Sequence, residues 1–167
     1  MQKTIFKTLL TISFVSVLFL TGCESKNLYD AAESGNLKIV KELVENGADV
    51  NTERRNPLMG AVKNGNLEVV KYLIAKGANV NQICNNIYEH DDETPLLEAA
   101  RSGNLAVVKY LVEKDADVNI KNEKGKTPLD VAKSEATKKA LRDAGGKSGD
   151  NPLESESDES KNESYGL

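Results

Sequence analysis

Apolar residues recur along this chain in one phrase that appears three times, beginning at Gly35, Gly65 and Gly103. Each copy reads Gly-Asn-Leu, continues through two branched apolar residues and a lysine to a further apolar pair, and closes on Val-Asn. The apolar positions fall at the i, i+3, i+4, i+7 spacing of one helical face, so each phrase predicts an amphipathic helix. The copies start 30 and then 38 residues apart, and a period of this size indicates a repeat architecture.

A shorter helix is expected before each phrase, because small apolar residues precede each of the three glycines. Methyl-sized side chains let two helices approach closely, and a following glycine is typical of a helix that ends in the left-handed conformation. Thr94-Pro95 and Thr127-Pro128 are typical helix starts, and Asn56 takes the place of Thr before Pro57. Each copy therefore predicts a helix–turn–helix pair.

The shared pattern, T-P-L-x-x-A-A-x-x-G-N-L-x-x-V-K-x-L-x-x-x-G-A-D-V-N, resembles the ankyrin repeat and recurs over residues 28–145. The resemblance implies an all-α solenoid of about four helix–turn–helix repeats, with short β-hairpin-like finger loops along one edge. The first and last copies depart from the pattern, so we expect them to act as caps whose outer faces meet water. The repeats are expected at 28–51, 52–81, 82–119 and 120–145.

Residues 1–22 have the layout of an export signal and are not expected to belong to the fold. Lys3 and Lys7 form a positive start, and an apolar stretch follows from Leu9 to Leu20. That stretch is shorter than a typical membrane-spanning helix, and the small residues Thr21 and Gly22 follow it. A basic start followed by an apolar stretch predicts a secretory signal that is removed from the mature protein.

The end of this leader, Leu20-Thr21-Gly22-Cys23, resembles the lipobox of bacterial lipoproteins. The resemblance implies cleavage before Cys23, a covalent lipid on its sulfur, and a short tether over residues 23–27. An ordinary signal peptide with an incidental cysteine is the alternative. Glu24 follows the cysteine, whereas Asp there is the familiar inner-membrane retention signal of Gram-negative lipoproteins. An exported protein, lipid-anchored to the cell membrane, is therefore expected, in the outer membrane facing the periplasm if the host has one.

The composition and net charge of the chain bear on its fold type and on the kind of partner it binds. The chain of 167 residues has no Trp and 5% aromatic residues, which suits a solenoid because each repeat buries small and branched residues against its neighbours. A net charge of −4 argues against a nucleic-acid partner, which usually requires a basic face. Residues 146–167 are rich in Ser and Glu and predict a disordered acidic tail, either solubilising or partner-binding.

Loop lengths break the period. The loop from Asn51 to Pro57 is short and carries Arg54-Arg55, which could dock a carboxylate or phosphate or could simply be solvated. The loop at residues 82–93 is the longest, and extra length in a repeat array often marks the binding face. It contains Tyr88, a candidate anchor for a partner, and then His90-Asp91-Asp92.

These last residues admit three interpretations: a solvated acidic turn, a pH-responsive contact through the histidine, or a metal site. Adjacent side chains do not easily converge on one ion, so no metal is expected. Cys84 lies in the same loop, and with Cys23 lipidated it has no partner for an internal disulfide. It is either a thiol without a role or a redox-reactive thiol open to intermolecular pairing.

The resemblance to the ankyrin family implies a contact surface on the concave face, made of finger tips and the exposed side of the first helices. Met59 and Leu97 stand where the family usually has His, so they either pack under the fingers or form an apolar binding stripe. The expected partner-binding residues are Tyr29, Asp30, Glu33, Arg54, Arg55, Met59, Lys63, Tyr88, His90, Asp91, Asp92, Leu97, Glu98, Arg101 and Lys124.

No nucleophile–base pair, carboxylate dyad or phosphate-binding glycine loop stands out, so we expect neither an enzyme nor a cofactor beyond the lipid. The sequence predicts a monomeric, membrane-tethered module that binds another protein in the bacterial cell envelope. One hypothesis is immunity-type inhibition of a toxin or effector. The alternatives are a scaffold or chaperone for a resident envelope enzyme, for instance in oxidative stress, and a metal-binding protein that uses the 82–93 loop.

Overall fold

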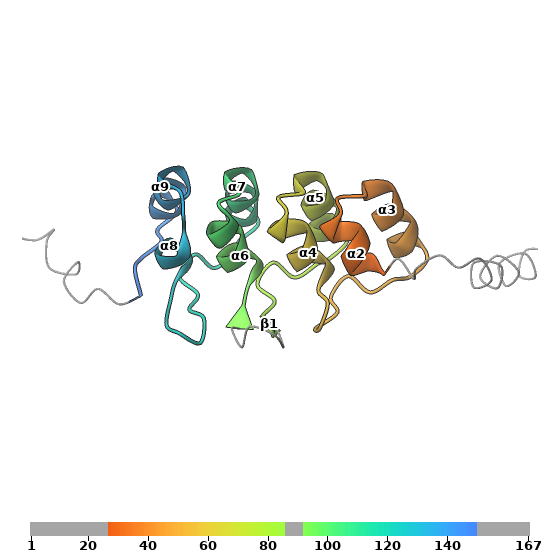
Figure 1. Cartoon of the computed structure of the whole chain (residues 1–167), viewed down its shortest axis with the longest axis horizontal. Coiled ribbons are helices and arrows are strands. Elements are labelled where there is room, and N and C mark those ends of the chain that lie inside the picture. Colours follow the sequence, from red (N-terminus) through yellow and green to blue (C-terminus); the bar gives the residue numbers. More distant parts are fainter. Residues whose placement is uncertain (1–26, 86–91, 150–167) are drawn as a thin grey trace, which may run out of the picture.

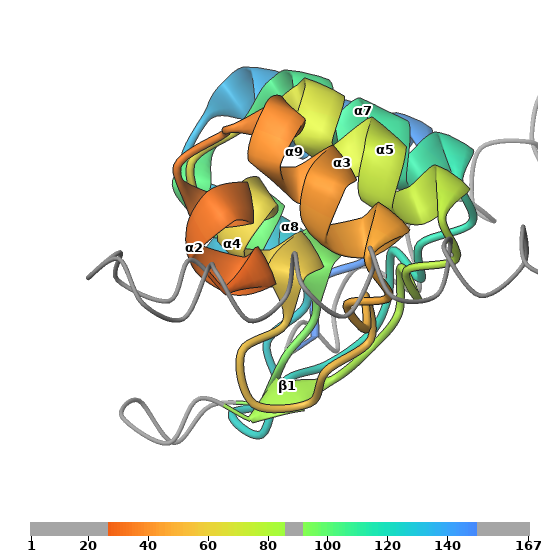
Figure 2. The same cartoon turned by 90° about the vertical axis from the view of Figure 1, so that its right-hand side faces the viewer.

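In the computed structural model, residues 27–85 and 92–149 are described, and their helices form antiparallel pairs stacked side by side (Figure 1). The first helices of the pairs form one row and the longer second helices form the other, as Figure 2 shows in a view along the stack. The first row is α2 (Leu28–Glu33), α4 (Pro57–Lys63), α6 (Pro95–Ser102) and α8 (Pro128–Val131). The second row is α3 (Leu37–Glu45), α5 (Leu67–Ala75), α7 (Leu105–Glu113) and α9 (Glu135–Asp143). This arrangement confirms the predicted all-α repeat solenoid.

Three loops extend from the edge of the first-helix row (Figure 1), and we call them finger one (51–56), finger two (81–94) and finger three (119–127). Finger two contains β1 (Cys84–Asn85) and β2 (Asp92–Glu93), which pair antiparallel with Cys84 opposite Glu93. Finger three closes through a hydrogen bond from the Asn122 amide to the Lys126 carbonyl, 3.0 Å. In the parts that the structure describes, fingers two and three are therefore hairpin-like, as the sequence predicts.

The recurring Gly-Asn pair joins neighbouring repeats. Gly35 has a φ of 72°, and a Cβ there would lie 2.7 Å from Oδ1 of Asn66 in the next repeat. The Asn66 side-chain amide donates to the carbonyls of Ala32 (3.0 Å) and Glu33 (2.9 Å). Gly65 and Asn104 repeat this contact one boundary later. The glycine is thus required both by its backbone conformation and by the close approach of the next asparagine.

The closing Val-Asn of each copy makes a second connection between repeats. Asn51, Asn81 and Asn119 each donate from Nδ2 to a carbonyl in the next turn, at 2.9, 3.1 and 3.2 Å. Each also accepts a 2.8 Å hydrogen bond on Oδ1 from a backbone amide in that turn. The last of these amides belongs to Lys147, so the ordered fold continues past the predicted end at residue 145 as far as Gly149.

The core runs through the stack between the two rows of helices. Leu73, Leu111 and Leu141 occupy equivalent places in α5, α7 and α9 and are fully buried. Burying such a side chain stabilises the fold by about 2 kcal/mol. Leu43, their counterpart in α3, is only partly buried because α2 and α3 form the end of the described stack. Repeat one therefore has the partly open outer face expected of a cap.

The predicted helix starts are observed. Asn56 caps α4 by accepting a hydrogen bond from the Met59 amide, and Thr94 and Thr127 cap α6 and α8 in the same way. Asp115 replaces the glycine that ends α3 and α5, and it is the one non-glycine residue with positive φ (62°) in the described chain. Within these described ranges, no helix is long and apolar enough to cross a membrane.

Candidate functional site

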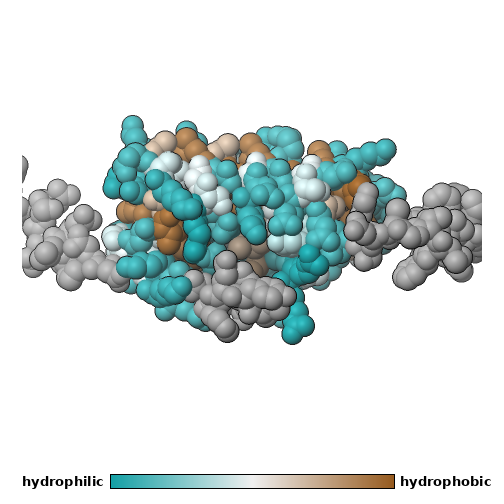
Figure 3. All heavy atoms as spheres, viewed as in Figure 1, coloured by the Kyte–Doolittle hydropathy of each residue, from teal (hydrophilic) through white to brown (hydrophobic). Residues whose placement is uncertain are grey.

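We use the name finger face for the side of the molecule formed by α2, α4, α6, α8 and the three fingers. Figure 3 shows that this side is mostly hydrophilic, with apolar groups along the edge of the second helices and a further group near α8. Ile83 in finger two is the only exposed large hydrophobic residue among those described, at 52% exposure. The face is therefore suited to charged and polar recognition more than to an extended apolar contact.

Arg55 fixes finger one against the first helix. Its guanidinium donates to Asp30 Oδ1 at 2.6 Å and lies over the Tyr29 ring, 4.8 Å from the ring centroid. Both members of the ion pair are exposed, so the pair contributes little to stability. Its consequence is positional, because an arginine that is held by a carboxylate and an aromatic ring presents a defined surface.

The same group of side chains continues onto α4. Tyr29 donates its hydroxyl to Glu33 Oε1 at 3.3 Å, and Lys63 lies 3.8 Å from the same oxygen. Partial burial and then the nearby Glu33 carboxylate raise the pKa of Tyr29, so the hydroxyl stays protonated and acts as a donor. The structure thus brings five predicted site residues together in one network, which we call the Tyr29 network: Tyr29, Asp30, Glu33, Arg55 and Lys63.

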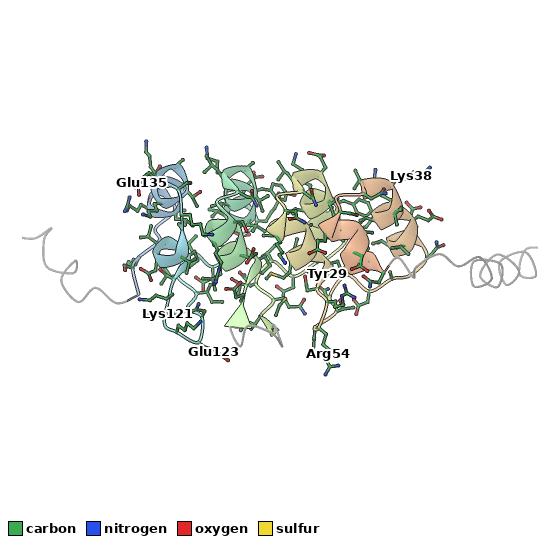
Figure 4. The ribbon with its side chains drawn as sticks, viewed as in Figure 1. Tyr29, Lys38, Arg54, Lys121, Glu123 and Glu135 are labelled. Carbon is green, nitrogen blue, oxygen red and sulfur yellow. The ribbon has the colours of Figure 1, made fainter. Side chains whose placement is uncertain are left out.

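Arg54 differs from its neighbour Arg55. It lies at the tip of finger one and points away from the helices, as Figure 4 shows beside Tyr29. Both side chains are exposed, but Arg55 is bonded to Asp30 on α2. Arg54 is therefore the more accessible of the two cations for a partner.

Arg101 ties finger two to α6. Its guanidinium contacts the carboxylate of Glu93 in β2, whose side chain is only 8% exposed. The Arg101 Nε is buried and has no hydrogen-bond partner within the described structure. On the same helix Glu98 accepts a hydrogen bond from Ser102, 2.7 Å. Arg101 thus has a positioning role at the base of the finger, while Glu98 remains at the surface.

The interpretation that Leu97 forms part of an apolar binding stripe is wrong. This residue is 0% exposed, so its side chain cannot contact a partner without local unfolding. Removing a leucine from water is worth about 2 kcal/mol, which explains why it packs inside the fold instead. Met59 is partly exposed and remains on the finger face.

Finger three carries exposed charge. Lys121 and Glu123 project from it in Figure 4, and Lys124 is also exposed. Asn122 is buried beneath the tip, where its Oδ1 accepts hydrogen bonds from the Lys124 and Lys126 amides at 3.1 and 2.9 Å. The asparagine therefore shapes the turn that presents the lysines.

Several predicted site residues fall beyond the described ranges. Cys23, Tyr88, His90 and Asp91 lie outside the described residues, as does the side chain of Asp92. Within the described ranges, no group of three or more His, Cys, Asp or Glu side chains could hold a metal ion. The predicted pH-responsive and metal roles of the histidine segment therefore stay predictions.

Cys84 is buried at the start of finger two, and its Sγ lies 3.8 Å from the Gln82 carbonyl. Burial raises the pKa of this thiol to about 11. At neutral pH the reactive thiolate is then scarce, and the residue has little access to an oxidant or to a second thiol. This environment favours the interpretation of Cys84 as a thiol without a chemical role.

Asp130 has a role that the repeat pattern does not predict. Burial alone would raise the pKa of its carboxylate, but hydrogen bonds donated by Ser148, Thr127 and Gly149 together lower that pKa to about 2. Asp130 closes a capping box with Thr127 at the start of α8. The T-x-x-D spacing is a signal that could have indicated the box. Nothing in the sequence pattern indicates the contact with Ser148 and Gly149.

Two family models match this chain. One, described as ankyrin repeats (3 copies), matches residues 2–84. The other, described as ankyrin repeats (many copies), matches residues 58–112 and 96–136. Together the two matches span most of the sequence and include every described helix except α9. No curated protein matches the chain significantly.

Proposed function

Because this chain belongs to the ankyrin-repeat family, whose repeats mediate binding to other proteins, we propose that it is a protein-binding module held at a bacterial membrane by a lipid on Cys23. The observation that carries the proposal is the Tyr29 network, together with the accessible Arg54 beside it. Aromatic and arginine side chains supply a large share of binding energy at protein interfaces. Side chains already held in place lose less entropy when a partner binds.

The partner contacts the finger face, with the Tyr29 network at its centre and Arg54 reaching out from finger one. The network offers both signs of charge, since Asp30 and Glu33 alternate with Arg55 and Lys63. A partner that carries the complementary order of charges is selected, because a reversed order brings like charges together. Tyr29 supplies the aromatic surface between them.

The tether places this contact near the lipid surface. Asn27 accepts a hydrogen bond from the Asp30 amide, 2.9 Å, so α2 begins directly after the short segment that follows Cys23. Four extended residues reach about 14 Å at most. Several acyl chains anchor a protein stably where a single chain would not. The lipobox-like Leu20-Thr21-Gly22-Cys23 supports this part of the proposal, and the partner is then met close to the headgroups.

Within this class, we favour an envelope-acting toxin or effector that the module inhibits by covering its surface. A photocrosslinking amino acid at position 54 tests the binding surface in native membranes, and the same group at position 135 on α9 is the matched control. We expect one specific adduct at position 54 that the control lacks. Identical adducts at both positions would refute the finger face as the binding surface. Identification of the adduct by mass spectrometry then distinguishes a toxin from a resident envelope enzyme, and the latter would replace the inhibitory role with a scaffolding one.

The anchor is tested separately. Mass spectrometry of the mature N-terminal peptide should detect a lipid on Cys23, and Cys23→Ala should release the protein from the membrane fraction. An unmodified Cys23 in the wild-type protein would overturn the tether and leave the finger-face assignment untouched. Insertion of a long flexible linker after Glu24 then measures whether proximity to the membrane matters. If the protein still binds its partner with the linker inserted and also when released from the membrane, the contact does not depend on proximity to the membrane.

A further inference from the structure

The chain does not leave the fold at the end of α9 but crosses to finger three. The Lys147 amide donates to Asn119 Oδ1 at 2.8 Å, and the Gly149 amide donates to Asp130 Oδ2 at 2.8 Å. Ser148 donates its hydroxyl to the other carboxylate oxygen of Asp130. We call residues 146–149 the strap. Its path is set by hydrogen bonds to two different elements, finger three and α8.

The strap also fits sterically against finger three. A Cβ on Gly149 would lie 2.3 Å from the Gly125 carbonyl oxygen, closer than any side chain can approach. From the other side, Lys121 Nζ donates to the Gly149 carbonyl at 3.2 Å. Gly149 is therefore seated between the tip of the finger and one of its lysines, and the strap ends at the finger.

Finger three and the sequence that follows the strap carry opposite charges. Finger three carries three exposed lysines, Lys121, Lys124 and Lys126, against the single Glu123. The sequence beyond the strap carries six acidic residues and one lysine: Asp150, Glu154, Glu156, Asp158, Glu159, Glu163 and Lys161. A surface of one sign joined directly to a segment of the other sign attracts it at a high effective concentration.

We propose that finger three is a docking surface for an acidic segment, and that its resident occupant is this chain's own tail, residues 150–167. The strap delivers the tail to the finger, and the lysines hold it through charge. A partner that uses finger three must displace the tail, so the tail selects for partners that bring denser negative charge. This inference depends neither on the lipid anchor nor on the identity of any partner.

A spin label on the tail tests the proposal directly. Ser160→Cys in residues 24–167, which include every described residue, provides a single exposed thiol, because Cys84 is buried. We expect the label to broaden the amide resonances of Lys121 to Lys126 in finger three. The amides of Thr52 to Arg55 in finger one should keep their intensity. Unperturbed finger-three signals, or equal broadening of both fingers, would overturn the proposal.

Matched charge variants show whether the lysines cause the contact. The triple variant K121E/K124E/K126E should abolish the broadening of the remaining finger-three amides. The control K38E/K109E/K139E makes the same change in net charge on the second helices and should leave the broadening intact. Equal loss in both variants would mean that net charge and not finger three attracts the tail. Raising the salt to about 0.5 M should weaken the contact in the unsubstituted chain, since exposed charges are then screened within a few ångströms.

The role of the strap has its own test. Gly149→Ala removes no charge, but its Cβ collides with the Gly125 carbonyl, so the strap must open. We expect weaker broadening at finger three, with the dispersed spectrum of the folded repeats retained. A synthetic peptide of residues 150–167 should compete with the attached tail only at about millimolar concentration, which is typical of a short flexible connection. Undiminished broadening in the alanine variant would show that the strap does not deliver the tail.

Discussion

The interior repeat boundaries and the two ends of the stack use the same sequence position in opposite ways. Asn66 and Asn104 precede α5 and α7 but do not cap them, because their side-chain amides cross to the preceding repeat. Asn36 stands in the same place before α3, at the end of the described stack, and there it caps its own helix. Ser134 does the same for α9. The residue before each second helix thus either caps that helix or bonds to the preceding repeat.

This difference shows how the stack balances its polar groups. A helix start has amides that need an acceptor, whereas a repeat boundary has buried carbonyls that accept from a donor. In the interior, the asparagine satisfies the carbonyls of the neighbouring repeat, and the helix start is left to solvent. At the last boundary Gly103 has open space above it, because serine replaces asparagine before α9. Asp130 and the strap join this end of the stack instead.

The largest effect is expected from Gly65→Ala compared with Gly103→Ala. Both glycines have positive φ, 71° and 75°, so alanine strains the backbone by about 1–2 kcal/mol in either place. At Gly65 the new Cβ also collides with Asn104 Oδ1 at 2.8 Å, which should bring the total loss to about 3 kcal/mol. Urea unfolding followed by circular dichroism measures both. Equal losses would mean that the asparagine contact contributes nothing to the need for glycine.

A second comparison removes the asparagines. Asn104→Ala removes the 3.1 Å hydrogen bond across the boundary to the Val62 carbonyl, which still accepts from the Gly65 amide, and should cost about 1.5 kcal/mol. Asn36→Ala loses only an exposed helix cap and should cost about 1 kcal/mol. As a control, Asn104→Ser supplies a cap but cannot reach across the boundary. If the serine variant is as stable as the wild type, capping and not the inter-repeat bond accounts for the asparagine.

The last boundary should respond to pH where the interior ones do not. The pKa of Asp130 is about 2 in the folded chain and 3.8 when unperturbed, so its stabilisation is present above pH 3.8 and is lost as the pH falls through 2. Allowing for solvent screening of this partly exposed group, we expect about 1 kcal/mol. The stability difference between the wild type and Asp130→Asn should shrink accordingly between pH 5 and pH 2, as measured by urea titrations. If this stability difference is constant between pH 5 and pH 2, the ionised form of Asp130 does not contribute to the stability.

The smallest effect is expected at Asp115, which ends α7 with positive φ where α3 and α5 are followed by Gly47 and Gly77. Asp115→Gly should stabilise the fold by about 0.5–1 kcal/mol, because glycine adopts this conformation without strain. Thermal unfolding monitored by circular dichroism will detect the gain. The reverse change, Gly77→Asp, is the matched control and should lose a similar amount. Unequal or absent effects would mean that the turn after α7 is shaped by other contacts.

The helices and turns of the repeats can be predicted from the sequence because the same motif occurs in several copies. Agreement between the copies predicts the helices, the left-handed glycines and the caps at Asn56 and Thr94, and all of them are observed. The burial of Leu97 does not follow from the same pattern, because a single leucine on a helix that faces loops does not reveal how closely the loops cover it.

Contacts that occur once are harder to predict. The sequence indicates the residues of the Tyr29 network, but the pairing of Arg55 with Asp30 joins a loop to a helix in the preceding repeat and has no sequence signature. The strap escapes prediction for a different reason. Ser148 and Gly149 belong by composition to a polar tail, and their order depends on one carboxylate of α8. Local composition cannot report a partner that lies 18 residues away in the chain.

The Gly-Asn contacts between repeats also have a direction: Asn66 and Asn104 each donate to the repeat before them, and the glycine of that repeat leaves room for the asparagine. A duplicated copy of the segment from Asn66 to Gly103 would carry a donor at its start and a receiving glycine at its end. Gene duplication can therefore lengthen such an array from within, without redesigning either terminus. The two ends, which use different residues, would be inherited unchanged, and the number of repeats can change over evolution while each junction keeps its fit.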